Sequence, residues 1–99
     1  MVYCRTGGDP HPGTPTFAVI WQGTALDELA DALVRSDLAQ QDEIERRVLQ
    51  LNARLAADPL DVGESRLGNW RVEFVDFVAI LFQVFPADGF VRVVHFWTY

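Results

Sequence analysis

Residues 70–97 read WRVEFVDFVAILFQVFPADGFVRVVHFW, and this stretch decides the fold. It holds three runs of valine, isoleucine and aromatic residues, the side chains that suit a pleated, half-buried surface. Pro86-Ala87-Asp88-Gly89 predicts a tight turn, because proline presets φ, aspartate bonds nearby backbone and glycine accepts positive φ. A shorter turn is expected at 75–77. The stretch therefore predicts a three-stranded antiparallel meander with strands at 70–75, 78–85 and 90–97.

Both faces of this predicted meander carry apolar side chains. Strand side chains alternate between faces, so Val93 and His95 are expected on one face and Arg92 and Phe96 on the other. A meander with one solvated face would alternate apolar and polar residues cleanly. Two interpretations stay open: a second layer of this chain's own core, or a partner that covers the second face.

Before the meander, the sequence predicts one short strand and two helices. Residues 16–21 form an apolar strand. Thr24 is expected to cap a short amphipathic helix, with Asp27 three residues later as the capping-box acid. A second helix over 38–57 begins after Ser36-Asp37 and ends at Asp58-Pro59, since the residue before proline disfavours the α region. With so short a link, the two helices are expected to form an antiparallel hairpin.

Length and composition indicate a single folded domain. The chain has 99 residues, 49% of them hydrophobic, which suits one modest core. We expect a folded domain over 16–99 and an irregular tail over 1–15, which is rich in proline and glycine. Cys4 is the single cysteine, and there is neither an apolar leader nor a run long enough to span a membrane. These features predict a soluble, cytoplasmic protein without membrane contact.

The charge is acidic overall and unevenly distributed. The formal net charge is −6, and all eight basic residues are arginines. Acids concentrate between Asp27 and Glu45, whereas most arginines come later in the chain. Such a balance argues against broad binding of a phosphate backbone, although it allows a local basic patch. No glycine-rich phosphate loop and no metal-ligand spacing occurs, so neither a cofactor nor a metal is expected.

The order strand, helix hairpin, loop and meander resembles the RelE/ParE toxin superfamily of bacterial type II toxin–antitoxin systems. The most specific part is the loop DPLDVGESR at 58–66, followed by VAILFQV at 78–84 and the turn and strand at 86–93. The resemblance implies an α+β fold of order β-α-α-β-β-β, with the helix hairpin on a mostly antiparallel sheet of about four strands. It also implies a cognate antitoxin as partner, packed on the sheet and the hairpin.

RelE-type members cleave messenger RNA on the ribosome, where the RNA's own 2′-hydroxyl attacks the neighbouring phosphate. That reaction needs cations on the developing phosphate charge and groups that transfer protons. Arg66, Arg71 and Arg92 are the candidates for the first role, with Arg71 and Arg92 expected on one face of the sheet. His95 and Tyr99, which share a strand face, are the candidates for the second.

Simpler roles and other functions compete with this hypothesis. Surface ion pairs with Glu64, Glu73 or Asp88 are the simpler explanation of the arginines. ParE-like members inhibit DNA gyrase through protein contacts, which needs no catalytic set and suits an acidic protein. An inactive member that only binds its partner, and a homodimer formed through the apolar sheet face, are further alternatives.

Overall fold

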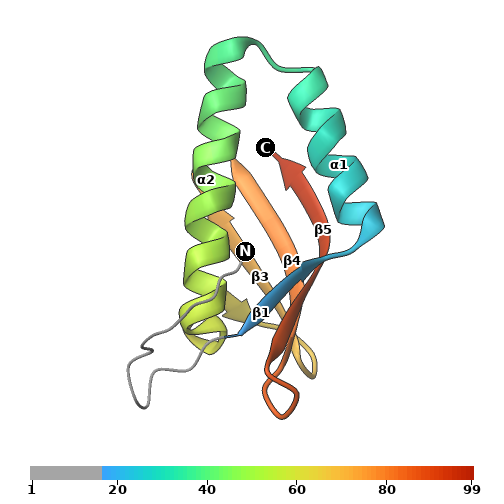
Figure 1. The fold of residues 1–99 in the computed structure, drawn as a ribbon, viewed down its shortest axis with the longest axis vertical. Coiled ribbons are helices and arrows are strands. Elements are labelled where there is room, and N and C mark those ends of the chain that lie inside the picture. Colours follow the sequence, from blue (N-terminus) through green and yellow to red (C-terminus); the bar gives the residue numbers. More distant parts are fainter. Residues whose placement is uncertain (1–16) are drawn as a thin grey trace, which may run out of the picture.

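The computed structural model describes residues 17–99, so the tail predicted for residues 1–15 lies outside the described part of the chain. Two helices pack on one face of a five-stranded sheet with strand order β1-β5-β4-β3-β2 (Figure 1). β1 runs parallel to β5, and the other neighbouring strands are antiparallel. The predicted α+β architecture is confirmed. The strands are β1 (Ala18–Trp21), β2 (Glu64–Ser65), β3 (Trp70–Val75), β4 (Val78–Phe85) and β5 (Phe90–Thr98).

The predicted meander is confirmed as β3, β4 and β5. Asp76 has a φ of 55° in the turn between β3 and β4, a conformation that a short polar side chain tolerates. Gly89 closes the following turn with a φ of 73°, as the turn chemistry predicted. Local sequence therefore sets both turns and with them the order of the three strands.

The helices are α1 (Gly23–Val34) and α2 (Leu38–Ala57), and the predicted bounds of α2 are confirmed. Asp37 and Gln40 form a capping box, in which the Asp37 carboxylate accepts from the Gln40 backbone N–H at 2.9 Å. The prediction that Thr24 caps α1 is wrong. Gln22 occupies the N-cap position without a side-chain bond, because its own N–H still pairs with the Val93 carbonyl at 2.9 Å and the helix starts directly from the strand.

A short fifth strand is the main addition to the predicted sheet of about four strands. The loop after α2 holds a 3-10 turn, η1 (Pro59–Asp61), and then returns as β2 along the edge of β3. Gly63 makes this return possible, since its φ is 70° and a Cβ there would overlap the carbonyl oxygen of Val72. The loop after α2 therefore has a defined shape.

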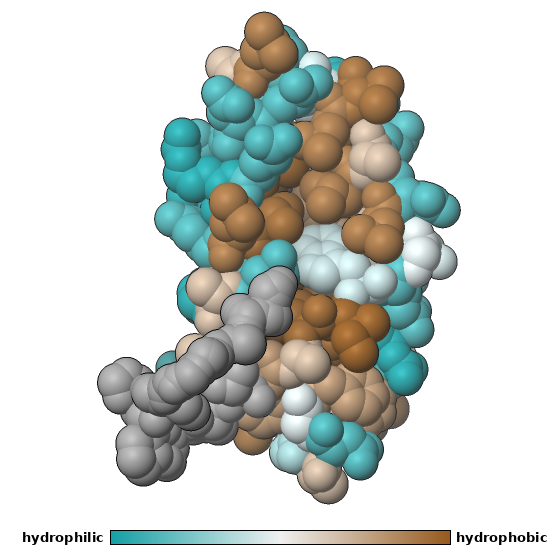
Figure 2. All heavy atoms as spheres, viewed as in Figure 1, coloured by the Kyte–Doolittle hydropathy of each residue, from teal (hydrophilic) through white to brown (hydrophobic). Residues whose placement is uncertain are grey.

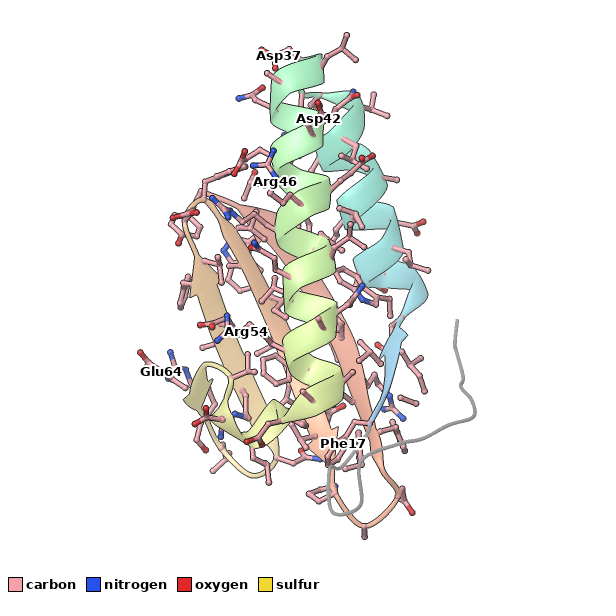
Figure 3. The ribbon with its side chains drawn as sticks, turned by 60° about the vertical axis from the view of Figure 1, so that its left-hand side comes forward. Phe17, Asp37, Asp42, Arg46, Arg54 and Glu64 are labelled. Carbon is pink, nitrogen blue, oxygen red and sulfur yellow. The ribbon has the colours of Figure 1, made fainter. Side chains whose placement is uncertain are left out.

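The main core lies between the helices and the sheet. Ile44, Leu51 and Leu55 of α2 pack with Ile80 and Phe82 of β4, and each of these side chains is almost fully buried. Polar contacts hold the same layers together: Trp21 donates through Nε1 to Asn52 Oδ1 at 2.8 Å, and Arg54 pairs with Glu73 at 2.9 Å. Figure 3 shows Arg54 reaching from α2 toward β3. Neither described helix is long and apolar enough to cross a membrane.

Candidate functional site

The face of the sheet turned away from the helices, here called the open face, is the candidate functional site. The register places Ala79 and Leu81 on it, because Val78, Ile80 and Phe82 enter the core on the helix side. Val72 lies on the same face, as the cross-strand partner of Leu81. Val72 and Ala79 are buried, yet neither belongs to the helix-side core. No element of residues 17–99 covers this face in Figure 1. Its larger side chains are Ile20, Trp70, Phe74, Leu81, Phe85, Phe90, Arg92, His95, Trp97 and Tyr99.

Aromatic side chains form a cluster at one end of the open face. The Phe74 ring lies edge-on to Trp97 at 6.2 Å and to Tyr99 at 5.7 Å between ring centroids. Phe74 remains 49% exposed in spite of these contacts. Tilted aromatic pairs of this kind stabilise one another beyond the area they bury, so the cluster is preformed. Contiguous apolar surface of this kind marks interaction sites in soluble proteins.

An arginine lies on a second aromatic pair at the other end. Phe85 and Phe90 stack with centroids 4.5 Å apart, and they flank the turn between β4 and β5. The Arg92 guanidinium carbon lies 5.1 Å from the Phe85 centroid and 5.9 Å from the Phe90 centroid. A cation at this distance is attracted by the ring faces. The pair therefore holds a permanent positive charge on the open face.

A β-bulge brings His95 to the same face as Arg92. Leu81 of β4 pairs with His95, and the next residue, Phe82, pairs with Val93, so Val94 has no partner. Simple alternation placed Arg92 and His95 on opposite faces, and that prediction is wrong. The extra residue shifts the alternation by one position. Arg92 lies opposite Gln83, and His95 lies opposite Leu81. The two side chains are therefore neighbours on the same face, about 7 Å apart along the strand.

His95 is held from the side by α1. Beyond the last residue of β1, α1 lies along the edge of β5 (Figure 1). Glu28 of α1 places both carboxylate oxygens 3.3 Å from His95 Nδ1, and Oε1 also accepts the backbone N–H of Phe96 at 2.9 Å. Glu28 was not singled out from the sequence, where it reads as one of several acids on the polar side of a helix.

The remaining arginine candidates are separated from Arg92. Arg71 pairs with Phe82 and therefore lies on the helix side, so the expectation that Arg71 and Arg92 share a face is wrong. Arg71 donates to the carbonyl oxygens of Val62 at 2.9 Å and Gly63 at 3.0 Å, which holds the loop before β2. Arg66 forms an exposed ion pair with Glu64 at 3.1 Å, one of the simpler roles that the sequence suggested.

A second apolar surface lies on the opposite side of the molecule, between the helices. Leu29, Leu33, Val48 and Leu49, with Glu45 at the rim, line a hollow of about 260 Å³ that we call the hairpin groove. Figure 2 shows hydrophobic side chains between α1 and α2 and hydrophilic ones along the outer flank of α2. Leu49 is 69% exposed, although the same helix buries Ile44, Leu51 and Leu55. An apolar residue outside this buried set was the signal for the groove in the sequence.

Comparison with known proteins identifies the fold. One chain of the crystal structure of the toxin–antitoxin complex RelBE2 from Mycobacterium tuberculosis matches with a TM-score of 0.68 at 15% sequence identity. The match covers 86% of this chain and 93% of that chain. No family model and no curated protein sequence matches. The protein therefore has the RelE-like fold that the resemblance of its loop and meander predicted.

Proposed function

We propose that this protein is the toxin of a type II toxin–antitoxin system and that a cognate antitoxin neutralises it. The likeness to a chain of a toxin–antitoxin complex supports the proposal. The open face and the hairpin groove support it as well, since both expose apolar side chains that a partner would cover. Acidic side chains concentrate on the two helices, so the segment bound in the groove carries basic residues beside its apolar anchors.

We further propose that the free toxin cleaves messenger RNA on the ribosome, with the open face as its reaction surface. The observation that carries this proposal is the bulge at Val94, which puts a fixed cation and an imidazole side by side. Arg92 offers its planar guanidinium to a phosphate, and His95 offers an imidazole that can accept or donate a proton. Tyr99, an exposed member of the aromatic cluster around Phe74 on the same face, is a third candidate for contact with the RNA.

The reaction follows from these roles. His95 Nε2 accepts the proton of the ribose 2′-hydroxyl, and the 2′-oxygen bonds to the adjacent phosphorus. Arg92 donates hydrogen bonds to the phosphate oxygens as negative charge develops on them. The bond from phosphorus to the 5′-oxygen breaks, and that oxygen takes a proton back from the imidazolium or from water. The products are a 2′,3′-cyclic phosphate and a 5′-hydroxyl end.

Local charge makes the open face compatible with RNA in an acidic protein. Glu64, Arg92 and His95 are the only ionisable residues at open-face positions of the five described strands. Glu64 lies at the far edge, on β2, and it is paired with Arg66. No described strand therefore places a carboxylate beside Arg92, and Glu28 of α1 contacts His95 from the side.

A non-enzymatic function is the alternative, either as a ParE-like inhibitor of DNA gyrase or as a partner-binding protein without activity. Two observations favour it. The net charge of −6 repels nucleic acid. Arg66 and Arg71 are occupied by contacts within the chain and do not join Arg92. A protein–protein contact would use the aromatic part of the open face without needing the arginine and the histidine together.

Induced expression in a bacterial host separates the two functions. Under the cleavage hypothesis, wild-type protein arrests growth and produces messenger RNA with new 5′-hydroxyl ends, whereas Arg92→Ala and His95→Gln restore growth. Arg46→Ala is the matched control, because Arg46 is an exposed helix arginine whose one ion pair within residues 17–99 is with Glu43. Arrest that persists unchanged in both variants, without new RNA ends, would instead support the non-enzymatic function.

A further inference from the structure

The contact between Glu28 and His95 joins residues that are 67 positions apart and comes from the packing of α1 against β5. Both oxygens of Glu28 face the same ring nitrogen, Nδ1, at 3.3 Å. The His95 side chain is 44% exposed and that of Glu28 is 38% exposed. A contact this exposed adds little to folding stability.

Glu28 is itself held in place by the backbone of β5. β1 pairs with β5 only as far as Trp21 and Val93, which leaves the next part of the β5 edge without a strand partner. Glu28 Oε1 accepts a hydrogen bond from the Phe96 backbone N–H at 2.9 Å, as a carbonyl oxygen of a neighbouring strand would do. A carboxylate anchored to backbone in this way has a fixed position relative to the neighbouring His95 side chain.

The two nitrogens of a neutral imidazole have different roles, and the partner of one decides the role of the other. A carboxylate accepts hydrogen bonds and donates none, so it selects the form of His95 with the proton on Nδ1. Nε2 is then left with a lone pair, and no described side chain bonds it. This is the form that a general base needs on the face that also carries Arg92.

We propose that Glu28 is the positioning residue of His95. It holds the ring with protonated Nδ1 toward α1 and with unprotonated Nε2 on the open face, ready to accept a proton. The effect of Glu28 on catalysis rests on the proposed cleavage of RNA. The effect of Glu28 on which nitrogen of His95 carries the proton does not depend on that function, so the two effects are measured separately.

The first measurement is nitrogen NMR of the His95 ring in the full-length protein, assigned by comparison with His95→Gln. In the wild type we expect neutral His95 with the proton on Nδ1. Glu28→Gln keeps an oxygen for the Phe96 N–H but adds an amide donor, so we expect the ring to shift toward the form with the proton on Nε2. Asp27→Asn is the matched control, since it removes one negative charge from the neighbouring exposed position of α1. It should leave the ring unchanged.

The second measurement is the rate of RNA cleavage, with unchanged β5 amide resonances as the check that Glu28→Gln folds. We expect kcat to fall by about tenfold with little change in KM, because substrate contacts remain and proton transfer is impaired. Asp27→Asn should keep the wild-type rate.

Three results would overturn the assignment: wild-type His95 with its neutral proton on Nε2, no response of the ring to Glu28→Gln, or full cleavage activity in that variant. The wild-type spectrum decides the matter even if Glu28→Gln does not fold. A shifted ring together with a wild-type protein that cleaves no RNA would support the role of Glu28 and reject RNA cleavage as the function.

Discussion

Arg92 and His95 lie on the same face of β5, although two residues stand between them and a regular strand would place them on opposite faces, because Val94 has no partner on β4. A regular strand would point one of the two side chains into the core beside Phe82. The bulge therefore does two things at once. It keeps Val93 and Phe96 buried on the helix side, and it exposes a cation and an imidazole together on the open face.

The two faces of the sheet should respond differently to loss of a phenylalanine. Phe82 is fully buried in the helix-side core, so Phe82→Ala should lower the free energy of unfolding by about 3–5 kcal/mol. Phe74→Ala removes the same atoms from the half-exposed cluster on the open face and should lower it by about 1 kcal/mol. Urea denaturation measures both values. Equal losses would mean that the open face is part of the core.

Gly63 should be much less tolerant of a side chain than Gly89. Both have positive φ, but a Cβ on Gly63 meets the backbone of Val72, whereas nothing lies within 4 Å of a Cβ on Gly89. Gly63→Ala should lower the free energy of unfolding by about 3 kcal/mol, from steric overlap and backbone strain together. Gly89→Ala should lower it by about 1 kcal/mol from strain alone. Thermal unfolding of the two variants is the measurement, and a ranking in the opposite order would contradict the packing of β2 on β3.

Arg71 should contribute to stability and Arg66 should not. Arg71→Ala leaves the carbonyls of Val62 and Gly63 without their side-chain donor, and we expect a loss of about 1–3 kcal/mol. Arg66→Ala removes only an exposed pair with Glu64 and should change the free energy of unfolding by less than about 0.5 kcal/mol. Chemical denaturation compares them. If the Arg71→Ala protein is as stable as the wild type but no longer arrests growth, Arg71 belongs to the functional site.

The hairpin groove should contribute to antitoxin binding without contributing to stability. Leu49→Asp places a charge in the groove at an exposed position, so unfolding should be unaffected while binding weakens at least about tenfold. Leu67→Asp is the matched control, since Leu67 is 90% exposed and belongs to the loop between β2 and β3. The dissociation constant for the proposed antitoxin is measured by calorimetry. Equal affinity for both variants would exclude the groove from the interface.

Much of the fold follows from local patterns in the sequence. The three meander strands and the turn at 86–89 were predictable, because alternation of side chains and turn chemistry act over a few residues. The bounds of α2 were predictable for the same reason, since Asp37 and Pro59 act within one helical turn. The two-residue strand β2 was not, because it depends on the contact between Gly63 and Val72 rather than on strand-forming side chains.

The residue types of the candidate site, an arginine and a histidine on the last strand of an apolar meander, can be read from the sequence alone. The face that each of them occupies depends on how β4 and β5 pair in the folded protein. The reason is that register is a property of two paired strands. The bulge exists because β4 and β5 must both keep their apolar residues against the helices. Neither strand alone specifies the position of the bulge. The same holds for Glu28, which reaches His95 only because α1 packs along the free edge of β5.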